Sequence, residues 1–368
     1  MYNNKTLIMK ANNLNNTTKS LMFLWINFLL VIFITICGCK KEIASTDELP
    51  KDFGIPIYAV GDVDEAQTES VLSNPNVTGF FIRVSWQSVE PEENQFDWTF
   101  IDNEMSKAVA YGKKVSIGII AGDLTPHWQN NPFTFLDFKI IPHDGDGHAR
   151  WTSIPIPWET PFLNAYTNLI KALKEHLSQK ASFYNVVSII KICGINQETA
   201  ETRLPYEDST YVEGIDTASN APAIWIANGY TQNKVYNAWK YIAEACQENF
   251  PDKDLDMAII PDPNGFPAID NMGKLILENL NTTTNDLVKI AANQYGNKII
   301  VQYNSFHGYS SKMEDLIDAQ NLGAKIAYQE NKAQSDKTFH SVEETIMNAK
   351  NQGAQFIELF NATIENNL

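Results

Sequence analysis

The chain has 368 residues, of which 44% are hydrophobic and 20% are charged. This composition is typical of a globular protein with a sizeable core, and it excludes disordered and collagen-like chains. The 28 Lys and Arg residues stand against 44 Asp and Glu, and the resulting net charge of −16 argues against nucleic acid as a partner. The four cysteines are too few for a disulfide framework or a zinc knuckle, so packed apolar side chains must hold the fold.

The N-terminus has the pattern of a signal peptide. Residues 1–19 contain three lysines and no acidic residue, and residues 21–37 are almost wholly apolar. The apolar run is about long enough to span a bilayer, so a plain membrane anchor is an alternative. The motif ICGC at residues 36–39 resembles a bacterial lipobox, in which a peptidase cuts before the second cysteine and a lipid is attached to it. We expect residues 1–38 to be the signal peptide and Cys39 to carry a lipid.

These features predict a lipoprotein of the cell envelope, anchored to the outer membrane on its periplasmic or cell-surface face. Residues 39–53 are mostly polar and are interpreted as a tether, and the segment KKE at 40–42 resembles the lysine–acid signals of Bacteroidetes surface lipoproteins. Residues 54–368 are then the folded domain. Its cysteines, Cys193 and Cys246, are expected to be buried thiols rather than a disulfide. The sequence leaves the oligomeric state open.

Eight short segments rich in β-branched and aromatic residues recur along this domain, which suits parallel strands covered on both faces. They span residues 55–61, 79–86, 114–122, 186–194, 255–262, 298–305, 324–330 and 354–361. Segments of helical periodicity lie between them, at residues 97–111, 161–177, 231–249, 272–280, 286–295, 311–321 and 341–351. This alternation predicts a single-domain α/β fold, a (β/α)8 TIM barrel, with a doubly wound sheet as the alternative.

Two further features of the barrel follow from the spacing of these segments. Only seven residues come after the last predicted strand, so the eighth helix is expected to be short or absent. Residues 123–160 are rich in Pro, Gly and Trp, and we expect them to form a large loop over the mouth of the barrel.

Two glutamates lie where predicted strands end. The active site of such a barrel lies at the carboxyl ends of its strands, and Glu198 follows the fourth strand while Glu330 ends the seventh. Retaining glycoside hydrolysis needs this arrangement, because one carboxyl group protonates the leaving oxygen while the other attacks the sugar carbon. Structural alternatives are a contact with a helix dipole for Glu198 and an ion pair for Glu330.

Motifs after the second and third strands resemble a known family. Residues 83–91 (RVSWQSVEP) and 94–98 (NQFDW) resemble the signature after strand two of clan A glycoside hydrolases, especially those similar to family 42 β-galactosidases. Residues 121–128 (AGDLTPHW) are similar to the end of strand three in that group, where an aromatic residue follows a proline. The resemblance implies a (β/α)8 enzyme that acts on an oligo- or polysaccharide.

The resemblance also implies roles for three residues. Glu198 corresponds to the acid/base, Glu330 to the nucleophile, and Arg83 to a strand-two cation near the nucleophile, where it would keep Glu330 ionised. Clan A enzymes usually have Asn directly before the acid/base, whereas Gln197 separates Asn196 from Glu198 in this chain.

That departure leaves Glu201, in the same segment, as an alternative acid/base. The residues predicted to bind substrate are Arg83, Trp86, Trp128, Asn196, Tyr303 and His307. The tryptophans at strand ends offer faces on which a sugar ring can stack, although packing in the core is the alternative for each of them. Tyr303 and His307 offer hydrogen bonds to the nucleophile or to a hydroxyl group, or serve as structural groups.

No metal ion and no cofactor is predicted. The chain has no HExxH motif, no glycine-rich phosphate loop and no serine nucleophile elbow, and its six histidines are scattered. Residues 143–148 (HDGDGH) offer ligands for a divalent cation, but a polar, glycine-rich turn is the simpler interpretation.

The sequence therefore predicts an exported lipoprotein glycoside hydrolase that cleaves a β-linked carbohydrate with retention, using Glu198 and Glu330. The alternative is a catalytically inactive TIM barrel that binds glycan at the cell surface. The sugar and the linkage stay open, because substrate choice on this fold depends on its loops.

Overall fold

Eight parallel strands close into a barrel in the computed structural model of the chain. In hydrogen-bonded order they are β1 (Ile57–Val60), β10 (Ile357–Phe360), β9 (Lys325–Glu330), β8 (Ile299–Phe306), β7 (Asp254–Ile259), β6 (Val187–Lys191), β3 (Lys114–Ile120) and β2 (Gly79–Ser85). The sheet closes where β1 pairs with β10, from Ile57 opposite Ile357 to Val60 opposite Phe360. The (β/α)8 prediction is confirmed, and every barrel strand overlaps a segment predicted as a strand.

The structure describes residues 51–140, 150–206, 219–260, 265–267, 269, 282–308, 311–331 and 341–368. Residues 52–368 form one compact unit. The predicted signal peptide, Cys39 and most of the tether lie outside the described residues. Within the described ranges, no helix has both the length and the apolar character needed to cross a membrane.

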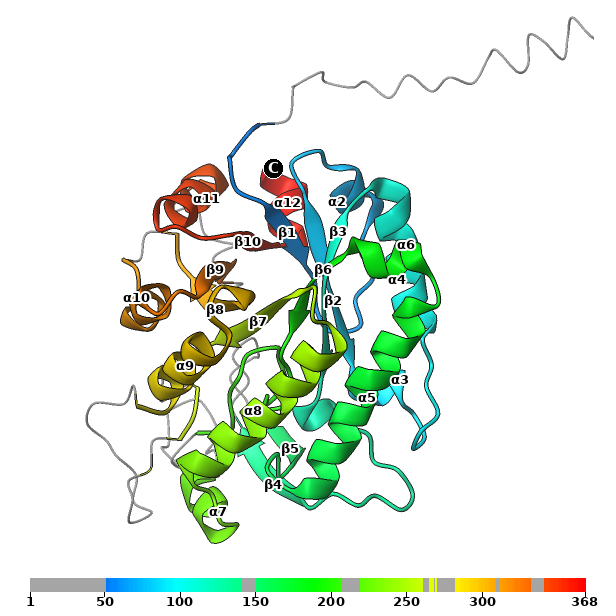
Figure 1. The fold of residues 1–368 in the computed structure, drawn as a ribbon, viewed down its shortest axis with the longest axis vertical. Coiled ribbons are helices and arrows are strands. Elements are labelled where there is room, and N and C mark those ends of the chain that lie inside the picture. The colour runs from blue at the N-terminus through cyan, green and yellow to red at the C-terminus, as the bar shows by residue number, and fades with distance from the viewer. Residues whose placement is uncertain are drawn as a thin grey trace, which may run out of the picture. The chain divides into compact units, whose positions relative to one another are not determined.

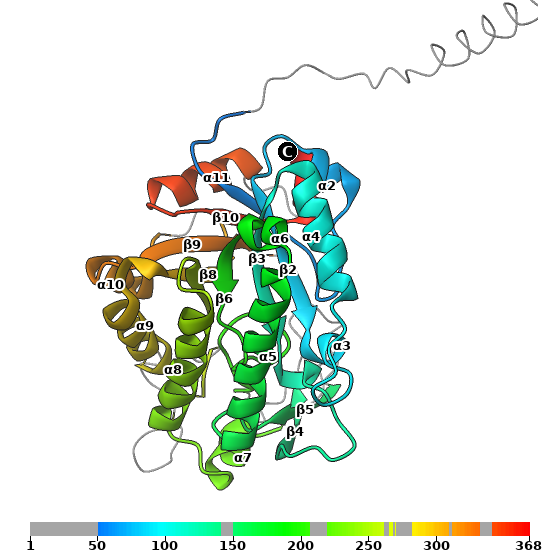
Figure 2. The ribbon, with the colours of Figure 1, turned by 45° about the vertical axis from the view of Figure 1, so that its right-hand side comes forward.

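Helices lie around the barrel (Figures 1 and 2). They are α2 (Glu69–Ser73), α3 (Trp86–Val89), α4 (Thr99–Tyr111), α5 (Thr160–Ser178), α6 (Ala181–Val186), α7 (Ala221–Ala227), α8 (Gln232–Asn249), α9 (Thr282–Tyr295), α10 (Glu314–Asn321), α11 (Val342–Asn351) and α12 (Asn361–Asn367). The final helix, α12, has seven residues, which confirms the expected short eighth helix. The helix predicted over 272–280 lies outside the described residues.

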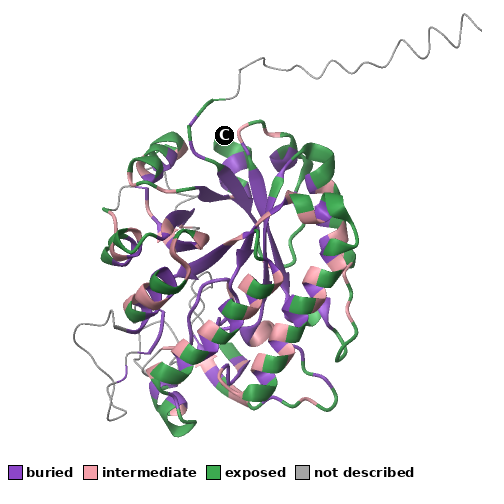
Figure 3. Cartoon of the chain, in the orientation of Figure 1, coloured by how far each residue is buried: buried purple, intermediate pink, exposed green. Residues whose placement is uncertain are grey.

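Burial follows the sequence pattern of each element. All seven positions of β2 are buried, including Arg83 and Ser85, as expected for a largely apolar strand covered on both faces. Helix α5 instead buries one stripe, made of Phe162, Tyr166, Leu169, Ile170, Leu173 and Leu177. The helical periodicity of these positions places them on one face of the helix. In Figure 3 the buried strands are surrounded by helices whose outer faces are exposed. Cys193 and Cys246 are buried free thiols, as predicted.

The segment from 123 to 160 is more regular than predicted. It contains an antiparallel pair, β4 (Phe135–Ile140) and β5 (Arg150–Pro155). In Figures 1 and 2 this hairpin lies at the end of the barrel toward which β2 and β3 run. The prediction of one large loop is therefore wrong in form, because the segment contains two paired strands.

A cluster of buried charges lies inside the barrel. The Nζ atom of Lys191 lies 2.8 Å from Glu358 Oε1 and 3.3 Å from Asp256 Oδ2, and it donates a hydrogen bond of 2.8 Å to Gln302 Oε1. Burial alone lowers the pKa of Lys191, but the attraction of Asp256 and Glu358 outweighs this effect and the pKa is raised. The ammonium group therefore stays charged and joins strands β6, β7, β8 and β10.

Replacing Lys191 with Met tests how strongly the barrel depends on this cluster. We expect the free energy of unfolding to fall by about 3–5 kcal/mol, because Asp256 and Glu358 would be left as buried charges without a cation. Urea denaturation measures the change. The exposed Lys114 at the start of β3 provides the control, since its replacement by Met is expected to change stability by at most about 0.5 kcal/mol. Equal effects of both substitutions would contradict the prediction.

Candidate active site

Three carboxyl groups lie at the carboxyl ends of barrel strands. Asp123 lies in the short 3-10 helix at Gly122–Leu124, directly after β3. Glu198 lies in the segment after β6, and Glu330 is the last residue of β9. In the closed sheet, β7 and β8 lie between β6 and β9. The two predicted catalytic glutamates thus come from strands that are not neighbours.

Backbone hydrogen bonds hold the segment after β6 against neighbouring strands. The N–H of Ile192 donates to Asp256 O at 2.8 Å, and the N–H of Thr202 donates to Ala258 O at 2.8 Å. Within the segment, the N–H of Arg203 donates to Ile195 O at 3.0 Å. These bonds give the loop that carries Glu198 a fixed path across the mouth.

The ends of β3 and β6 are also joined to each other. The N–H of Asp123 donates to Gln197 O at 3.0 Å, and the Oδ1 of Asn196 accepts from the N–H of Ala121 at 3.3 Å. Gly122 has a φ of +65°, and a Cβ atom there would lie 2.0 Å from Gln197 O. Only glycine allows this close approach, which brings Asp123 next to the segment that carries Glu198.

Glu198 contacts two arginines. Its Oε1 lies 3.3 Å from Nη2 of Arg203, and its Oε2 accepts a hydrogen bond from Nη2 of Arg150. Arg203 is buried, whereas the side chain of Arg150 is 52% exposed and reaches Glu198 from the hairpin strand β5. The same Nη2 atom of Arg150 lies 3.6 Å from Oδ2 of Asp123. Arg150 therefore lies between two carboxylates.

Burial and charge change the proton affinity of Asp123. Burial raises its pKa to about 6, the charge of Glu198 adds to the increase, and the charge of Arg150 opposes it. A carboxyl group with a pKa in this range exchanges its proton near neutral pH. Sequence reasoning missed both Asp123 and Arg150, because the hairpin that brings Arg150 to the mouth was not predicted.

Glu330 is placed as expected at the end of β9, but its surroundings differ from the prediction. Its Oε2 accepts a hydrogen bond of 3.3 Å from the N–H of Phe360, at the start of α12. Burial raises the pKa of Glu330, and contacts with Thr363 and the Phe360 N–H reduce the effect. Glu330 is thus held by the last strand and helix of the chain.

The contacts of Arg83 differ from the ion pair with Glu330 that the resemblance implies, and its predicted role near the nucleophile stays a prediction. Nη1 of Arg83 donates to Gly61 O at 3.4 Å, beyond the end of β1. No ion pair between Arg83 and Glu330 occurs among the described side chains, and the pKa of Glu330 is raised rather than lowered. Glu330 contacts the N–H of Phe360, and Arg83 contacts the carbonyl of Gly61, which follows Val60 opposite Phe360.

Asn196 and Glu201 are both buried in the loop that carries Glu198. The Oδ1 of Asn196 also accepts from the N–H of Gly194 at 2.9 Å, so this side chain supports the loop. Glu201 is 8% exposed, and the side chain of Glu198 is 11% exposed. The ion pairs with Arg150 and Arg203 single out Glu198 as the carboxylate in an electrostatic network.

The structure corrects the expectation that Trp86 and Trp128 offer faces to a sugar. Trp86 is fully buried and donates from Nε1 to Glu90 Oε2 at 2.7 Å. Trp128 is 7% exposed and lies edge-on to Trp86, with ring centroids 5.9 Å apart. Both rings belong to an aromatic cluster with Phe133, and Trp86 also packs against Phe162 and Tyr166 of α5. They support the mouth from below rather than line it.

Tyr303 and His307 lie near the carboxyl end of β8. Burial raises the pKa of Tyr303, and a hydrogen bond with Ser305 reduces the effect. Nε2 of His307 lies 3.3 Å from Nδ2 of Asn331, the residue that follows Glu330. His307 is therefore placed beside the strand end that carries Glu330, and its predicted role in substrate binding stays a prediction.

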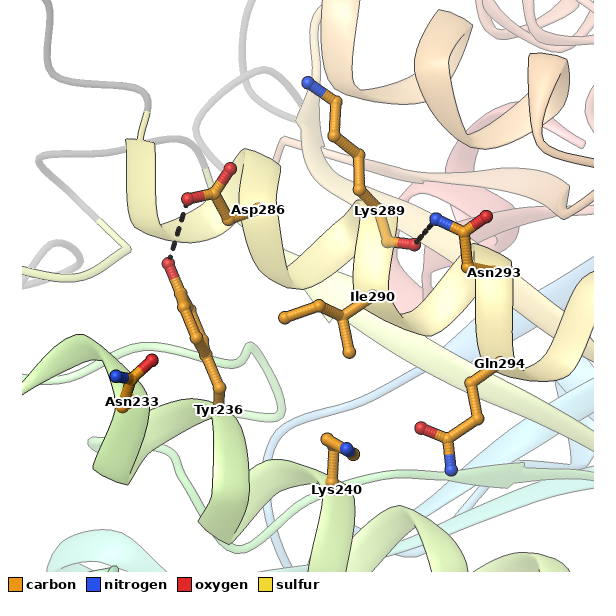
Figure 4. Close-up of a pocket in the computed structure, with 8 residues that line it drawn as sticks. All are labelled: Asn233, Tyr236, Lys240, Asp286, Lys289, Ile290, Asn293 and Gln294. Carbon is orange, nitrogen blue, oxygen red and sulfur yellow. Dashed lines mark hydrogen bonds between the residues drawn. The ribbon is translucent and has the colours of Figure 1, made fainter.

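Neither a metal-ligand cluster nor the groove between α8 and α9 lies at the candidate site of the described residues. The described residues contain no group of three or more His, Cys, Asp or Glu side chains that could hold a metal ion, and residues 143–148 lie outside the described ranges. A groove of about 650 Å³ lies between α8 and α9, where Tyr236 donates to Asp286 Oδ2 at 3.3 Å (Figure 4). Because it lies in the outer helical layer, it is separate from the strand ends.

The chain is similar to one family model and to solved barrels. The glycoside hydrolase family 42 model, described as beta-galactosidase, matches residues 73–204. The catalytic domain of a beta-amylase from Paenibacillus polymyxa is similar in structure, with a TM-score of 0.53 and 12% identity over 84% of this chain and 92% of that chain. Xylanase 10B from Thermotoga petrophila RKU-1, in complex with xylobiose, has a TM-score of 0.47 and 12% identity over 84% of this chain and 82% of that chain. No curated protein matches.

The beta-amylase domain and the family model support different conclusions about this chain. The beta-amylase domain supports the barrel fold alone, because its identity to this chain is low. The family match begins before β2 and ends after β6, so it includes Asp123, Glu198 and Arg203. The resemblance recognised from the motifs of residues 83–98 and 121–128 is thereby confirmed.

Replacing Asp123 with Asn tests the buried carboxyl group through its pH dependence. Burial raises the pKa of Asp123 in the folded chain to about 6, above its ordinary value, so Asp123 stabilises the fold below pH 4 and loses this contribution as the pH rises through 6. D123N should therefore gain stability relative to wild type between pH 4 and pH 7, by about 3 kcal/mol. Urea denaturation at each pH measures the difference.

Asp97 provides a control of opposite sign. This exposed carboxylate accepts a hydrogen bond from Thr99, which lowers its pKa. D97N should therefore lose stability relative to wild type as the pH rises through 4. A stability difference between D123N and wild type that stays constant from pH 4 to pH 7 would show that Asp123 titrates as an ordinary exposed carboxylate.

Proposed function

We propose that the chain is a clan A glycoside hydrolase that cleaves a β-linked carbohydrate with retention of configuration at the anomeric carbon, a proposal supported by the family match over residues 73–204 and by the closed (β/α)8 barrel. The observation that carries the proposal is the position of two glutamates at one end of the barrel. Glu198 follows β6, the fourth barrel strand along the chain, and Glu330 ends β9, the seventh. Retaining glycosidases place one carboxyl group on each side of the scissile bond.

In the proposed reaction, Glu198 is the acid/base and Glu330 is the nucleophile. Glu198 gives its proton to the glycosidic oxygen while Glu330 attacks the anomeric carbon, and a covalent glycosyl-enzyme forms as the alcohol leaves. Glu198 then takes a proton from water, which attacks the anomeric carbon and releases the sugar from Glu330. Each carboxyl group ends the cycle in the protonation state in which it began.

The surroundings of Glu330 support a defined part of this mechanism. The Phe360 N–H donates to its carboxylate, so one backbone group stabilises the charge that Glu330 needs before it attacks. Burial raises its pKa, so the nucleophile is protonated and inactive at acid pH. The rate should therefore fall as the pH is lowered.

The substrate class follows from the family match and the charge of the protein. The matching family model is described as beta-galactosidase, so aryl β-galactosides are the first substrates to assay. The chain carries a net charge of −16, which disfavours polyanionic glycans and leaves neutral oligo- or polysaccharides as the proposed substrates.

Glu330→Gln tests the nucleophile. We expect kcat to fall by about 10³-fold or more, because an amide cannot form the glycosyl-enzyme. Hydrolysis of a panel of aryl β-glycosides, with the fold checked by circular dichroism, measures the effect. Glu175→Gln on the outer face of α5 is the control, since the Glu175 side chain is 66% exposed and far from the strand ends in sequence and structure. An E330Q variant as fast as wild type would remove Glu330 from the mechanism.

The first-formed product reports the stereochemistry. A retaining enzyme should release the β-anomer first, which proton NMR detects before mutarotation mixes the anomers. Release of the α-anomer first would replace retention by inversion. A folded wild-type protein that binds a glycan in calorimetry without cleaving any member of the panel would instead support the inactive glycan-binding barrel.

We also propose that the chain is exported and anchored in the cell envelope by a lipid on Cys39, on the outer membrane. The apolar segment at 21–37 and the lipobox-like motif at 36–39 support this proposal. Cys39→Ser should abolish labelling by an alkyne-tagged fatty acid and move the processed protein from the membrane to the soluble fraction. Equal labelling of the variant and the wild type would contradict lipidation at this residue.

A further inference from the structure

Arg150 connects two carboxyl groups that come from different strand ends. Its Nη2 atom contacts Oε2 of Glu198 and lies 3.6 Å from Oδ2 of Asp123. The side chains of these acids are 11% and 15% exposed, so solvent screens their interaction only partly. Arg150 belongs to the β4–β5 hairpin, which is an addition to the eight-stranded barrel.

The charged and polar groups around the two acids come from three segments. Glu198 faces Arg150 of β5 and Arg203 of its own loop. Asp123 faces Glu198 and Arg150, together with the Thr152 side chain of β5. Glu201 is a further buried carboxyl group in the loop of Glu198. The half-exposed Arg150 thus lies between Asp123 and Glu198. The buried Arg203 contacts the other carboxylate oxygen of Glu198.

We propose that Asp123 and Arg150 are positioning residues that act in opposite directions on the proton of Glu198. The proposal rests on the function proposed above, in which Glu198 is the acid/base. An acid/base must hold a proton before it meets the substrate, and two guanidinium groups beside Glu198 favour loss of that proton. The negative charge of Asp123 opposes this loss, and its carboxylate also competes for Arg150.

The surroundings of Asp123 set the pH range in which this carboxyl group ionises. Burial and Glu198 raise the pKa of Asp123 to about 6, so this group gains its charge between pH 5 and pH 7. The charge on Asp123 lies beside Glu198 and Arg150, where it opposes the attraction of the two guanidinium groups for the Glu198 carboxylate.

The pH dependence of kcat/KM in the full-length protein, kept in detergent, tests the proposal. The alkaline limb of the profile reports loss of the proton from the acid. In D123N this limb should move to lower pH by about one unit, because a like charge next to Glu198 is removed. In R150Q the limb should move to higher pH by about one unit, because a cation is removed.

Control variants separate charge from structure. Arg150→Lys keeps the positive charge and should leave the limb close to its wild-type position. Asp137→Asn, at an exposed position of the same hairpin, should leave the whole profile unchanged. A purely structural role of Asp123 or Arg150 would lower the rate at every pH without moving the limb, and that result would overturn the proposal.

A second measurement needs no substrate. The difference in unfolding free energy between D123N and wild type is measured in urea at pH 4 and pH 7, and again in the E198Q and R150Q backgrounds. This stability difference should increase with pH in the wild-type background. The increase should be smaller in the E198Q background and larger in the R150Q background. An increase that is the same in all three backgrounds would show that the groups are not coupled, which also overturns the proposal.

The two measurements distinguish the failure of each idea. If the wild type hydrolyses no glycoside but the stability changes follow the expected pattern, the coupling between the groups stands and the glycosidase proposal fails. If hydrolysis occurs through Glu198 and neither the limb nor the stability pattern changes, the glycosidase proposal stands and the role of Asp123 and Arg150 is wrong.

Discussion

Closure of the barrel is the constraint on which the rest of the structure depends. The first strand hydrogen-bonds with the last, from Ile57 opposite Ile357 onward, and all neighbouring strands of the closed sheet are parallel. Residues that end different strands are therefore brought to one end of the barrel, however far apart they lie in sequence. This is why Asp123, Glu198 and Glu330 belong to a common candidate site.

Charged side chains have different surroundings inside the barrel and at its mouth. Inside, the ammonium group of Lys191 is enclosed with the two carboxyl groups of Asp256 and Glu358, away from solvent. At the mouth, the acids meet arginines, and Arg150 stays half exposed. A guanidinium group can contact two carboxylates at once, which a compact ammonium group does less readily. The inner cluster is suited to stability, and the outer one is suited to proton chemistry.

Several differences between the sequence predictions and the structure have the same origin, because the position of a residue in a motif does not give the direction of its side chain. Arg83 lies in a motif that resembles clan A enzymes, yet its guanidinium group donates to Gly61 O. Trp86 follows β2 directly, and its ring is buried against Trp128 and Phe133. The β4–β5 pair brings Arg150 to Glu198. Its two strands are joined through residues 141–149, and their pairing depends on contacts that a pattern of single residues does not display.

The sequence by itself determined the order of strands and helices, the (β/α)8 fold, the short last helix and the strand ends at which acids lie. These properties depend on hydrophobic periodicity and on local chain order, which can be read from neighbouring residues. Only the tertiary structure decided that Arg150 joins Asp123 to Glu198, that Glu330 contacts the start of α12, and that Trp86 is enclosed. Such contacts join residues from separate strands and loops, so their geometry and electrostatics exist only once the barrel has closed.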